Sequence, residues 1–193
     1  MTVNLNEFRW LNESELKIEN GKIYMTSASH SDIICNPLDG SALSTAPFFY
    51  QEIEGDFLIS ACVKPTFVST YDACALVVYA DERHWLKTCF EYTDFETNSI
   101  VTVATDTTSD ESIGADIEAD SVYLQIMRKG NVFACHYSVD GKTYQLSRKL
   151  RLNVPNKVKI GISVQSPTGA GQVMEFSDLH ISQTLPEDMR KSK

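Results

Sequence analysis

The chain has 193 residues, of which 42% are hydrophobic and 22% charged, so one β domain of this length can bury a core without disulfides. The formal net charge of −9 repels phosphate backbones and anionic lipids, which argues against nucleic acid and membrane partners. No stretch reaches the roughly 18 apolar residues of a membrane span, and the start of the chain lacks the pattern of a signal peptide. The cytoplasm is the expected location.

Short runs rich in Val, Ile, Tyr, Phe and Thr alternate with turn residues, which is typical of a β-sandwich. The first two runs form a predicted hairpin, because Asn20-Gly21 favours a tight turn between 16–18 and 22–26. Residues 107–120 are acidic and irregular, and they predict a long loop with at most one short strand. Further predicted strands cover 57–64, 73–79, 84–92, 100–105, 122–128, 132–138, 143–150, 157–165 and 173–181.

The pattern predicts an all-β fold, a two-sheet antiparallel β-sandwich, formed by a single domain over residues 1–185. Residues 186–193 form a polar C-terminal tail, which is expected to be frayed. The five cysteines are odd in number and contain no C-x-x-C pair, so they are expected to be small buried side chains. The four scattered histidines give no metal-ligand spacing, and no cofactor or metal is expected.

Strand alternation assigns side chains to faces, because successive residues point to opposite sides of a sheet. In 84–92, Leu86 and Phe90 are predicted to point toward the other sheet. If 73–79 and 84–92 lie in one sheet, four side chains share its outer, water-facing surface: Tyr79, Trp85, Lys87 and Glu91. Aromatic rings beside charged groups suit a shallow groove for a sugar or another small polar ligand.

Several alternatives remain open at this face. Asp72 and Glu91 can meet across strands, and an ion pair between Lys87 and Glu91 can serve only to fix strand register. Tyr79 and Trp85 can stack on a sugar, or they can be covered by the loop near Tyr50 or by a partner chain.

Arg128 ends its strand beside the Lys129-Gly130 turn. Its guanidinium can bond backbone carbonyls across that hairpin, or it can point into the groove.

A series of short motifs, in this order, resembles the DUF1349 family, which includes proteins labelled "regulation of enolase protein". The motifs are Gly55-Asp56-Phe57, Tyr71-Asp72, His84-Trp85-Leu86-Lys87 with Glu91-Tyr92, Arg128-Lys129-Gly130, Ser138-Val139-Asp140-Gly141 and Ser166-Pro167. The resemblance implies a concanavalin A-like lectin/glucanase fold of jelly-roll type, whose concave sheet binds sugars in distant relatives. It also draws attention to Asp72, Lys87, Glu91 and Arg128. Ala73 and Ala75 depart from the glutamine and glycine frequent in relatives.

The leading hypothesis is a non-catalytic binding module that takes a carbohydrate or small polar ligand on the concave sheet. The alternative is a regulatory protein that uses the same face against a protein or as a homodimer. A glycoside hydrolase comes third, because the Glu-x-Asp-x-x-Glu run that the resemblance leads one to expect in glycosidases of this fold is absent and no catalytic residue is assigned. The predicted ligand-binding residues are Asp72, Tyr79, Trp85, Lys87, Glu91 and Arg128.

Overall fold

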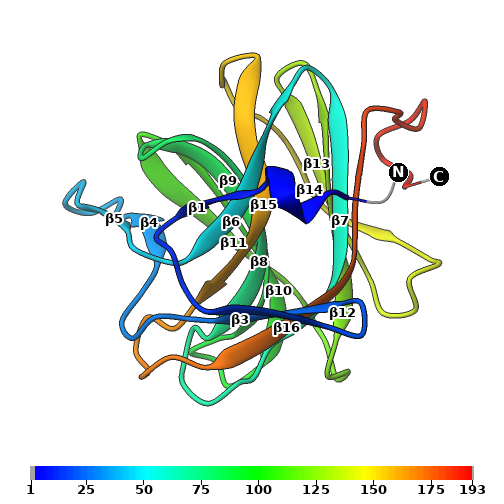
Figure 1. Cartoon of the computed structure of the whole chain (residues 1–193). Helices are drawn as coiled ribbons and strands as arrows, with labels where there is room; N and C mark the ends of the chain where they lie inside the picture. Colours follow the sequence, from blue (N-terminus) through cyan, green and yellow to red (C-terminus); the bar gives the residue numbers. More distant parts are fainter. Residues whose placement is uncertain (1–2, 193) are drawn as a thin grey trace.

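The computed structural model describes residues 3–192, and two large antiparallel sheets packed face to face make up most of it (Figure 1). The prediction of an all-β, two-sheet antiparallel sandwich of jelly-roll type is therefore confirmed. Before the first strand, Leu5–Glu7 form a single 3-10 turn, η1. Within residues 3–192, no helix is both long enough and apolar enough to cross a membrane.

The sheet that carries the candidate site is called the front sheet. It has seven strands in the spatial order β1 (Arg9–Leu11), β6 (Phe48–Glu54), β15 (Lys157–Gln165), β8 (Ala73–Asp81), β9 (His84–Tyr92), β10 (Asn98–Asp106) and β11 (Thr108–Asp116).

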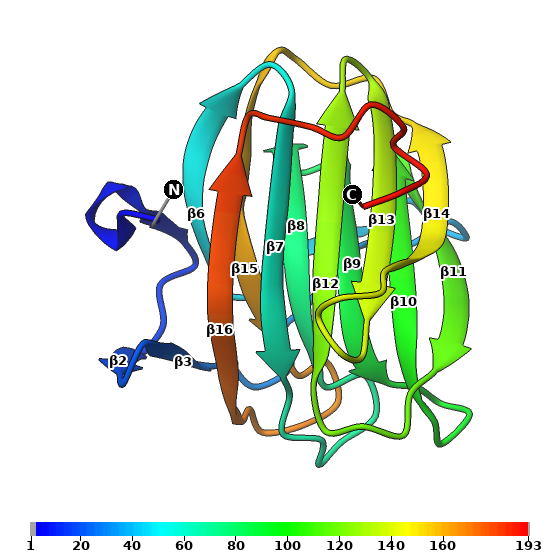
Figure 2. The same cartoon turned by 90° about the vertical axis from the view of Figure 1, so that its right-hand side faces the viewer.

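The opposite sheet is called the back sheet, and its strands face the viewer in Figure 2. Its order is β14 (Gln145–Arg151), β13 (Val132–Ser138), β12 (Val122–Lys129), β7 (Phe57–Lys64), β16 (Val173–Ser182), β3 (Lys22–Thr26) and β2 (Leu16–Glu19). A separate two-stranded ribbon, β4 (Ile33–Cys35) and β5 (Ala42–Ser44), lies outside the front sheet, at the left of Figure 1.

The main core fills the space between the two sheets. Leu76, Leu86 and Phe90 of the front sheet share it with Ile126 and Phe133 of the back sheet, and all five are buried. Leu86 and Phe90 are the alternate residues that the strand pattern assigns to the interior, and burying one face of each sheet is what holds a sandwich together.

The predicted hairpin between β2 and β3 is confirmed. Asn20 and Gly21 both have positive φ, 52° and 77°, as a two-residue turn of the mirror-image class requires. The turn after Ser138 is held in a similar local way, because Asp140 Oδ1 accepts hydrogen bonds from the backbone N–H groups of Lys142 and Thr143.

The expectation of a long loop over residues 107–120 is wrong. Strand β11 occupies nine of those residues and pairs with β10 from Asp106↔Thr108 to Ser99↔Asp116. It is the edge strand of the front sheet, and most of its side chains are exposed. An edge strand that is exposed to solvent on both faces does not need alternating apolar and polar residues, and its charges discourage pairing with other chains. The sequence of β11 therefore resembles that of a loop.

The expectation of a frayed tail is wrong at Met189 and Arg190. The C-terminal segment crosses the outside of the back sheet (Figure 2), where Met189 packs against Leu58, Met127 and Ala134. Met189 is only 6% exposed, and the carbonyl of Arg190 lies 3.4 Å from Nε2 of His136. One apolar residue in a polar segment is enough to dock it.

Met189→Asp is expected to detach the tail while the sandwich stays folded. A carboxylate in this apolar contact loses the burial of the methionine and costs about 1–3 kcal/mol of docking free energy. Hydrogen exchange of the amides in 185–191 should become fast, whereas amides of β12 should stay protected. Glu187→Ala, an exposed neighbour, is the matched control, and equal exchange in both variants would contradict the docking role of Met189.

Candidate functional site

Strand parity at the predicted face is as expected, but the exposure is not. Tyr79, Trp85, Lys87 and Glu91 all point away from the core between the sheets, on the outer face of the front sheet. They are not water-facing: Trp85 is fully buried, and the other three are 3–5% exposed. The prediction of an open surface is corrected here.

The cover is the chain segment between β3 and β6. Ile33 of β4 and Ala46, together with Phe48 at the start of β6, pack with Tyr79 and Trp85 in a second apolar cluster on the outer face of the front sheet. The ring of Phe48 lies 6.1 Å from that of Tyr79. Of the alternatives that the sequence left open, covering by a nearby part of the chain is the one realised for Tyr79 and Trp85.

Trp85 and Tyr79 therefore have structural contacts. The indole N–H of Trp85 donates to the carbonyl of Glu82 at 3.3 Å, and the Tyr79 hydroxyl lies 3.4 Å from Oγ of Ser44. Neither side chain lines a cavity on this face. Tyr79 and Trp85 belong to the apolar cluster that packs beside the polar residues of the same face.

Lys87 is the centre of a buried polar network. Its Nζ donates three hydrogen bonds of 2.9 Å each, to Asp32 Oδ1, to the carbonyl of Ile33 and to Gln165 Oε1. Lys87 forms an ion pair with Asp32, a residue of the covering segment. This pair takes the place of the ion pair with Glu91 that the sequence suggested. Burial lowers the pKa of Lys87, but the neighbouring acidic groups, Asp32 first among them, together outweigh burial and the net shift is upward, so the ammonium stays charged.

Gln165 of β15 connects Lys87 to Glu91. Its Nε2 donates to the carbonyl of Tyr71 at 3.2 Å and to Oε2 of Glu91 at 3.4 Å. Cross-strand register explains the meeting, because Gln165 and Glu91 are both partners of Ala73, from opposite sides. The alanine between them leaves room for both longer side chains.

Glu91 is the most perturbed acid of the site. Burial is the main reason that its pKa is raised to about 8, and within that net shift Lys87 acts in the opposite direction while the carboxylates of Glu111, Asp32 and Asp94 act in the same one. The carboxyl group is therefore mainly protonated at neutral pH. A neutral carboxylic acid can both donate and accept a hydrogen bond.

A cavity of about 380 Å³ opens above Lys87 and Glu91. Its walls come from β4, β9, β10, β11, the end of β15 and the loops at 71 and 94–95. The polar lining residues are Asp32, Lys87, Glu91, Asp94, Glu111 and Gln165, and the apolar and aromatic ones are Ile34, Tyr71, Phe95, Val103 and Ile113.

Tyr71 has a backbone conformation that tyrosine seldom adopts, with φ of 70°. It is held there by a hydrogen bond from its N–H to the carbonyl of Tyr92. Strained backbone of this kind costs about 1–3 kcal/mol and collects at ligand sites. Here it places Tyr71 at the wall of the cavity.

Asp72 and Arg128 do not reach this cavity. Asp72 accepts hydrogen bonds from the N–H groups of Val68 and Ser69 through Oδ2, and from Oγ of Ser166 through Oδ1. Arg128 lies on the back sheet, where its guanidinium bonds the carbonyls of Gly130, Pro155 and Asn156. The alternative that Arg128 bonds backbone carbonyls is the one found.

Asp72→Ala should lower the free energy of unfolding by about 1–3 kcal/mol, because the buried hydroxyl of Ser166 and two partly buried N–H groups lose their acceptor. Urea unfolding measures this loss. Asp120→Ala, on an exposed loop, is the control and should change stability by less than about 0.5 kcal/mol. An Asp72→Ala protein as stable as its parent would contradict this role.

Sequence reasoning missed Asp32, Gln165, Glu111 and Asp94 as members of the site. Asp32 and Asp94 lie in loops without a recognisable spacing, and Glu111 lies on the edge strand that was expected to be a loop. Gln165 carried a usable signal, because it directly precedes the Ser166-Pro167 motif at the end of a predicted strand.

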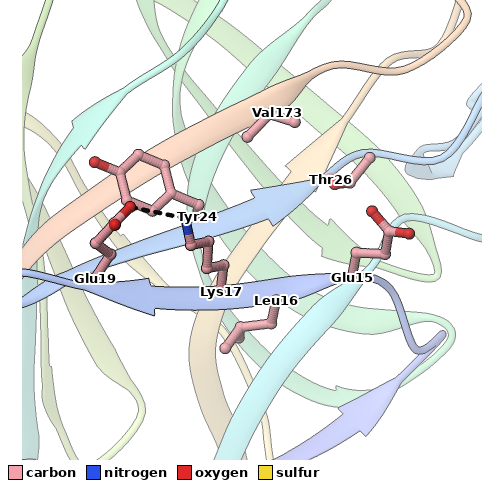
Figure 3. A pocket seen from close by; sticks show the side chains of 7 residues that line it. All are labelled: Glu15, Leu16, Lys17, Glu19, Tyr24, Thr26 and Val173. Atoms are coloured by element: carbon pink, nitrogen blue, oxygen red, sulfur yellow. Dashed lines mark hydrogen bonds and ion pairs between the residues drawn. The ribbon is translucent and has the colours of Figure 1, made fainter.

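A larger hollow of about 720 Å³ lies beside the β2–β3 hairpin (Figure 3). Its lining includes Lys17 and Glu19, which pair with each other at 2.8 Å and are mostly exposed. Each residue lining it is half-buried or exposed. No buried polar group is aimed into this hollow from its lining, so it lacks the fixed donors and acceptors that specific binding needs.

Metal chemistry has no visible support in the part of the chain that the structure describes. Residues 3–192 contain no group of three or more His, Cys, Asp or Glu side chains placed to hold an ion. The five cysteines are free thiols, and four of them are buried.

Solved structures of other proteins share this fold. A structure of a functionally unknown protein from Saccharomyces cerevisiae superposes with a TM-score of 0.88 at 24% identity, covering 95% of this chain and 100% of that one. The carbohydrate-binding module CBM66 from Bacillus subtilis superposes with a TM-score of 0.59 at 10% identity, covering 91% of this chain and 95% of that module. These likenesses establish a β-sandwich fold shared with a carbohydrate-binding module.

The sequence comparisons agree with the resemblance found in the motifs. "Regulation of enolase protein 1" of Saccharomyces cerevisiae is 23% identical over 184 residues, which are 94% of this chain and 92% of that protein. The model of the family described as "protein of unknown function (DUF1349)" matches residues 10–184. The chain belongs to the DUF1349 family.

Proposed function

We propose that this protein is a non-catalytic binding module that holds a small polyhydroxylated ligand, of the carbohydrate class, in the cavity above Lys87 and Glu91. The observation that carries the proposal is the composition of that cavity. Its lining includes the aromatic residues Tyr71 and Phe95, called the aromatic wall, and the buried pair Glu91 and Gln165, called the polar floor, whose Oε2 and Nε2 atoms lie 3.4 Å apart. Apolar ring faces together with a few oriented polar groups are the usual recipe of a small-molecule site.

The polar floor suits hydroxyl groups. A sugar hydroxyl both donates and accepts hydrogen bonds. The protonated carboxyl group of Glu91 and the amide of Gln165 likewise offer both a donor and an acceptor. The aromatic wall suits the C–H face of a sugar ring, and Phe95 is 69% exposed and free to receive it. The fold shared with a carbohydrate-binding module is consistent with this assignment.

The test is a titration with a panel of neutral hexoses and short oligosaccharides, followed by backbone NMR. At least one sugar should shift the amide signals of β9, of the 94–95 loop and of β11 together. Phe95→Ala should weaken that binding by about fivefold or more, the equivalent of about 1 kcal/mol. Val139→Ala, at an exposed turn beside the back sheet, is the control. A panel without any such shift would overturn the proposal.

A contact with another protein is the second candidate, and one feature favours it. Phe95, Ile113 and Leu43 are apolar side chains that are 69%, 40% and 41% exposed. Ile113 and Phe95 line the cavity, and Leu43 is the strand partner of Ile34, which lines it too. Together they form an apolar rim, and such rims mark interaction surfaces.

Light scattering at increasing protein concentration, with Ile113→Asp as the variant, separates the two candidates. Self-association that the variant abolishes would favour the protein contact. A monomer at all concentrations, with sugar binding intact, would favour the ligand site.

A further inference from the structure

The cavity above Lys87 and Glu91 has an unbalanced set of charges. Four carboxyl side chains line it, those of Asp32, Glu91, Asp94 and Glu111, and Lys87 is its one cationic lining residue. A charge count alone does not define a ligand, because exposed carboxylates can be solvated. The distribution of partners among these groups decides the matter.

Lys87 has no proton left for a ligand. An ammonium group has three N–H donors, and those of Lys87 are taken by Asp32, the Ile33 carbonyl and Gln165, each at 2.9 Å. Its charge is also compensated by Asp32. The one cation in the cavity wall is therefore committed to the fold, and an anionic ligand would find no free cationic donor there.

Glu91 is in the opposite situation. Glu91 is only 5% exposed. Among the described residues its carboxyl group receives a single hydrogen bond, the long 3.4 Å contact from Gln165 Nε2 to Oε2. Oε1 has no hydrogen-bond partner in residues 3–192, and Glu91 belongs to the cavity lining. Burial and the neighbouring carboxylates outweigh Lys87 and keep this carboxyl group protonated, because a buried carboxylate that no cation pairs with directly is costly. A cation bound in the cavity would let Glu91 release that proton.

We propose that the cavity selects an amine-bearing polyhydroxylated ligand, an amino sugar in chemical class, whose ammonium group sits against Glu91 between Asp94 and Glu111. This deepens the proposed function and rests on it. The ammonium pairs with Glu91, whose carboxyl group releases its proton to solvent on binding, and the exposed Asp94 and Glu111 in the cavity lining add attraction. The ring hydroxyls then meet Gln165, with the ring face toward Tyr71 and Phe95.

The closing experiment is a matched titration. Glucose, galactose and mannose are each offered in three forms that differ at one position: the free amine, the N-acetyl amide and the parent hydroxyl. Glucuronate is the anionic comparison. Calorimetry near pH 7 should show at least one free amine binding about tenfold or more tightly than its amide and its hydroxyl partner, and raised salt should narrow the gap.

Glu91→Gln keeps the shape and removes the charge. In this variant the amine should lose its advantage, so that the amine and hydroxyl forms of the same sugar bind with affinities within about threefold of each other. Glu187→Gln, an exposed residue of the tail, should leave both affinities unchanged.

The outcomes separate the two proposals. If a neutral hexose or its amide binds as tightly as the amine, the amine selectivity is overturned and the carbohydrate site stands. Tighter binding of glucuronate overturns it as well. If no sugar of any form binds, both the selectivity and the proposed function are overturned.

Discussion

Lys87→Met should lower the free energy of unfolding by about 3–5 kcal/mol. The methionine has nearly the same length and stays apolar, so packing against Trp85 survives. What is lost is the cation that three acceptors share: Asp32, the Ile33 carbonyl and Gln165. Removing one partner of a buried ion pair leaves the other charge uncompensated, which costs more than the pair itself contributes.

A double variant tests that explanation. Asp32→Asn added to Lys87→Met removes the orphaned carboxylate, and it should recover a substantial part of the lost stability. Lys159→Met is the control for the loss of a lysine, because Lys159 lies 5.4 Å above the rings of Tyr50 and Tyr79 and its loss should cost about 1 kcal/mol or less. Urea unfolding of all four proteins gives the comparison. A Lys87→Met protein within about 1 kcal/mol of its parent would contradict the central role of this ammonium.

The strand pattern was sufficient to assign the two faces of β9. Parity depends only on local geometry, since each residue of a strand points opposite to its neighbours, and Leu86 and Phe90 lie in the main core as expected. The exposure of the second face depends on a different segment of the chain. Phe48 and Ile33 are far from Trp85 in sequence, and β4 has only three residues. The residues near Trp85 in sequence therefore give no sign that a distant segment covers its side chain.

Asp72 and Arg128 show a second limit. Each is a charged residue beside a turn, and a sequence gives its type without its partners. In both cases the partners are backbone groups, the N–H groups of Val68 and Ser69 for Asp72 and carbonyls near Asn156 for Arg128. Backbone groups have no sequence signature, so a charge that completes a loop cannot be told from a charge that awaits a ligand. Lys87 and Glu91 remain candidate ligand residues because they line a cavity.

Glu91→Gln should stabilise the protein progressively as the pH rises from 5 to 8.5. The Glu91 carboxyl group has a pKa raised, mainly by burial, to about 8 in the folded protein, against 4.5 in the unfolded chain. Between these values the folded state keeps a proton that the unfolded state has released. Stability therefore falls with rising pH across this window, and the slope is about 1.4 kcal/mol for each pH unit.

Glutamine carries no proton to lose, so the variant escapes this loss. Its advantage over the parent should be small at pH 5 and reach a few kcal/mol, at most about 4, by pH 8.5. The groups that set the effect face Glu91 from several elements: Lys87 on its own strand, Asp32 before β4, Asp94 after β9 and Glu111 on β11. Other titrating groups affect both proteins equally and cancel in the difference.

Urea unfolding of parent and variant at pH 5, 7 and 8.5 measures that difference, with Glu187→Gln as a control whose offset should not change with pH. Parallel stability curves for parent and Glu91→Gln would mean that Glu91 is already ionised at neutral pH, with its charge balanced by Lys87. In that case the carboxylate would need no second cation, and the reason for an ammonium in the cavity would disappear. The pH dependence of stability thus tests, without any ligand, the electrostatic imbalance from which the ligand class is inferred.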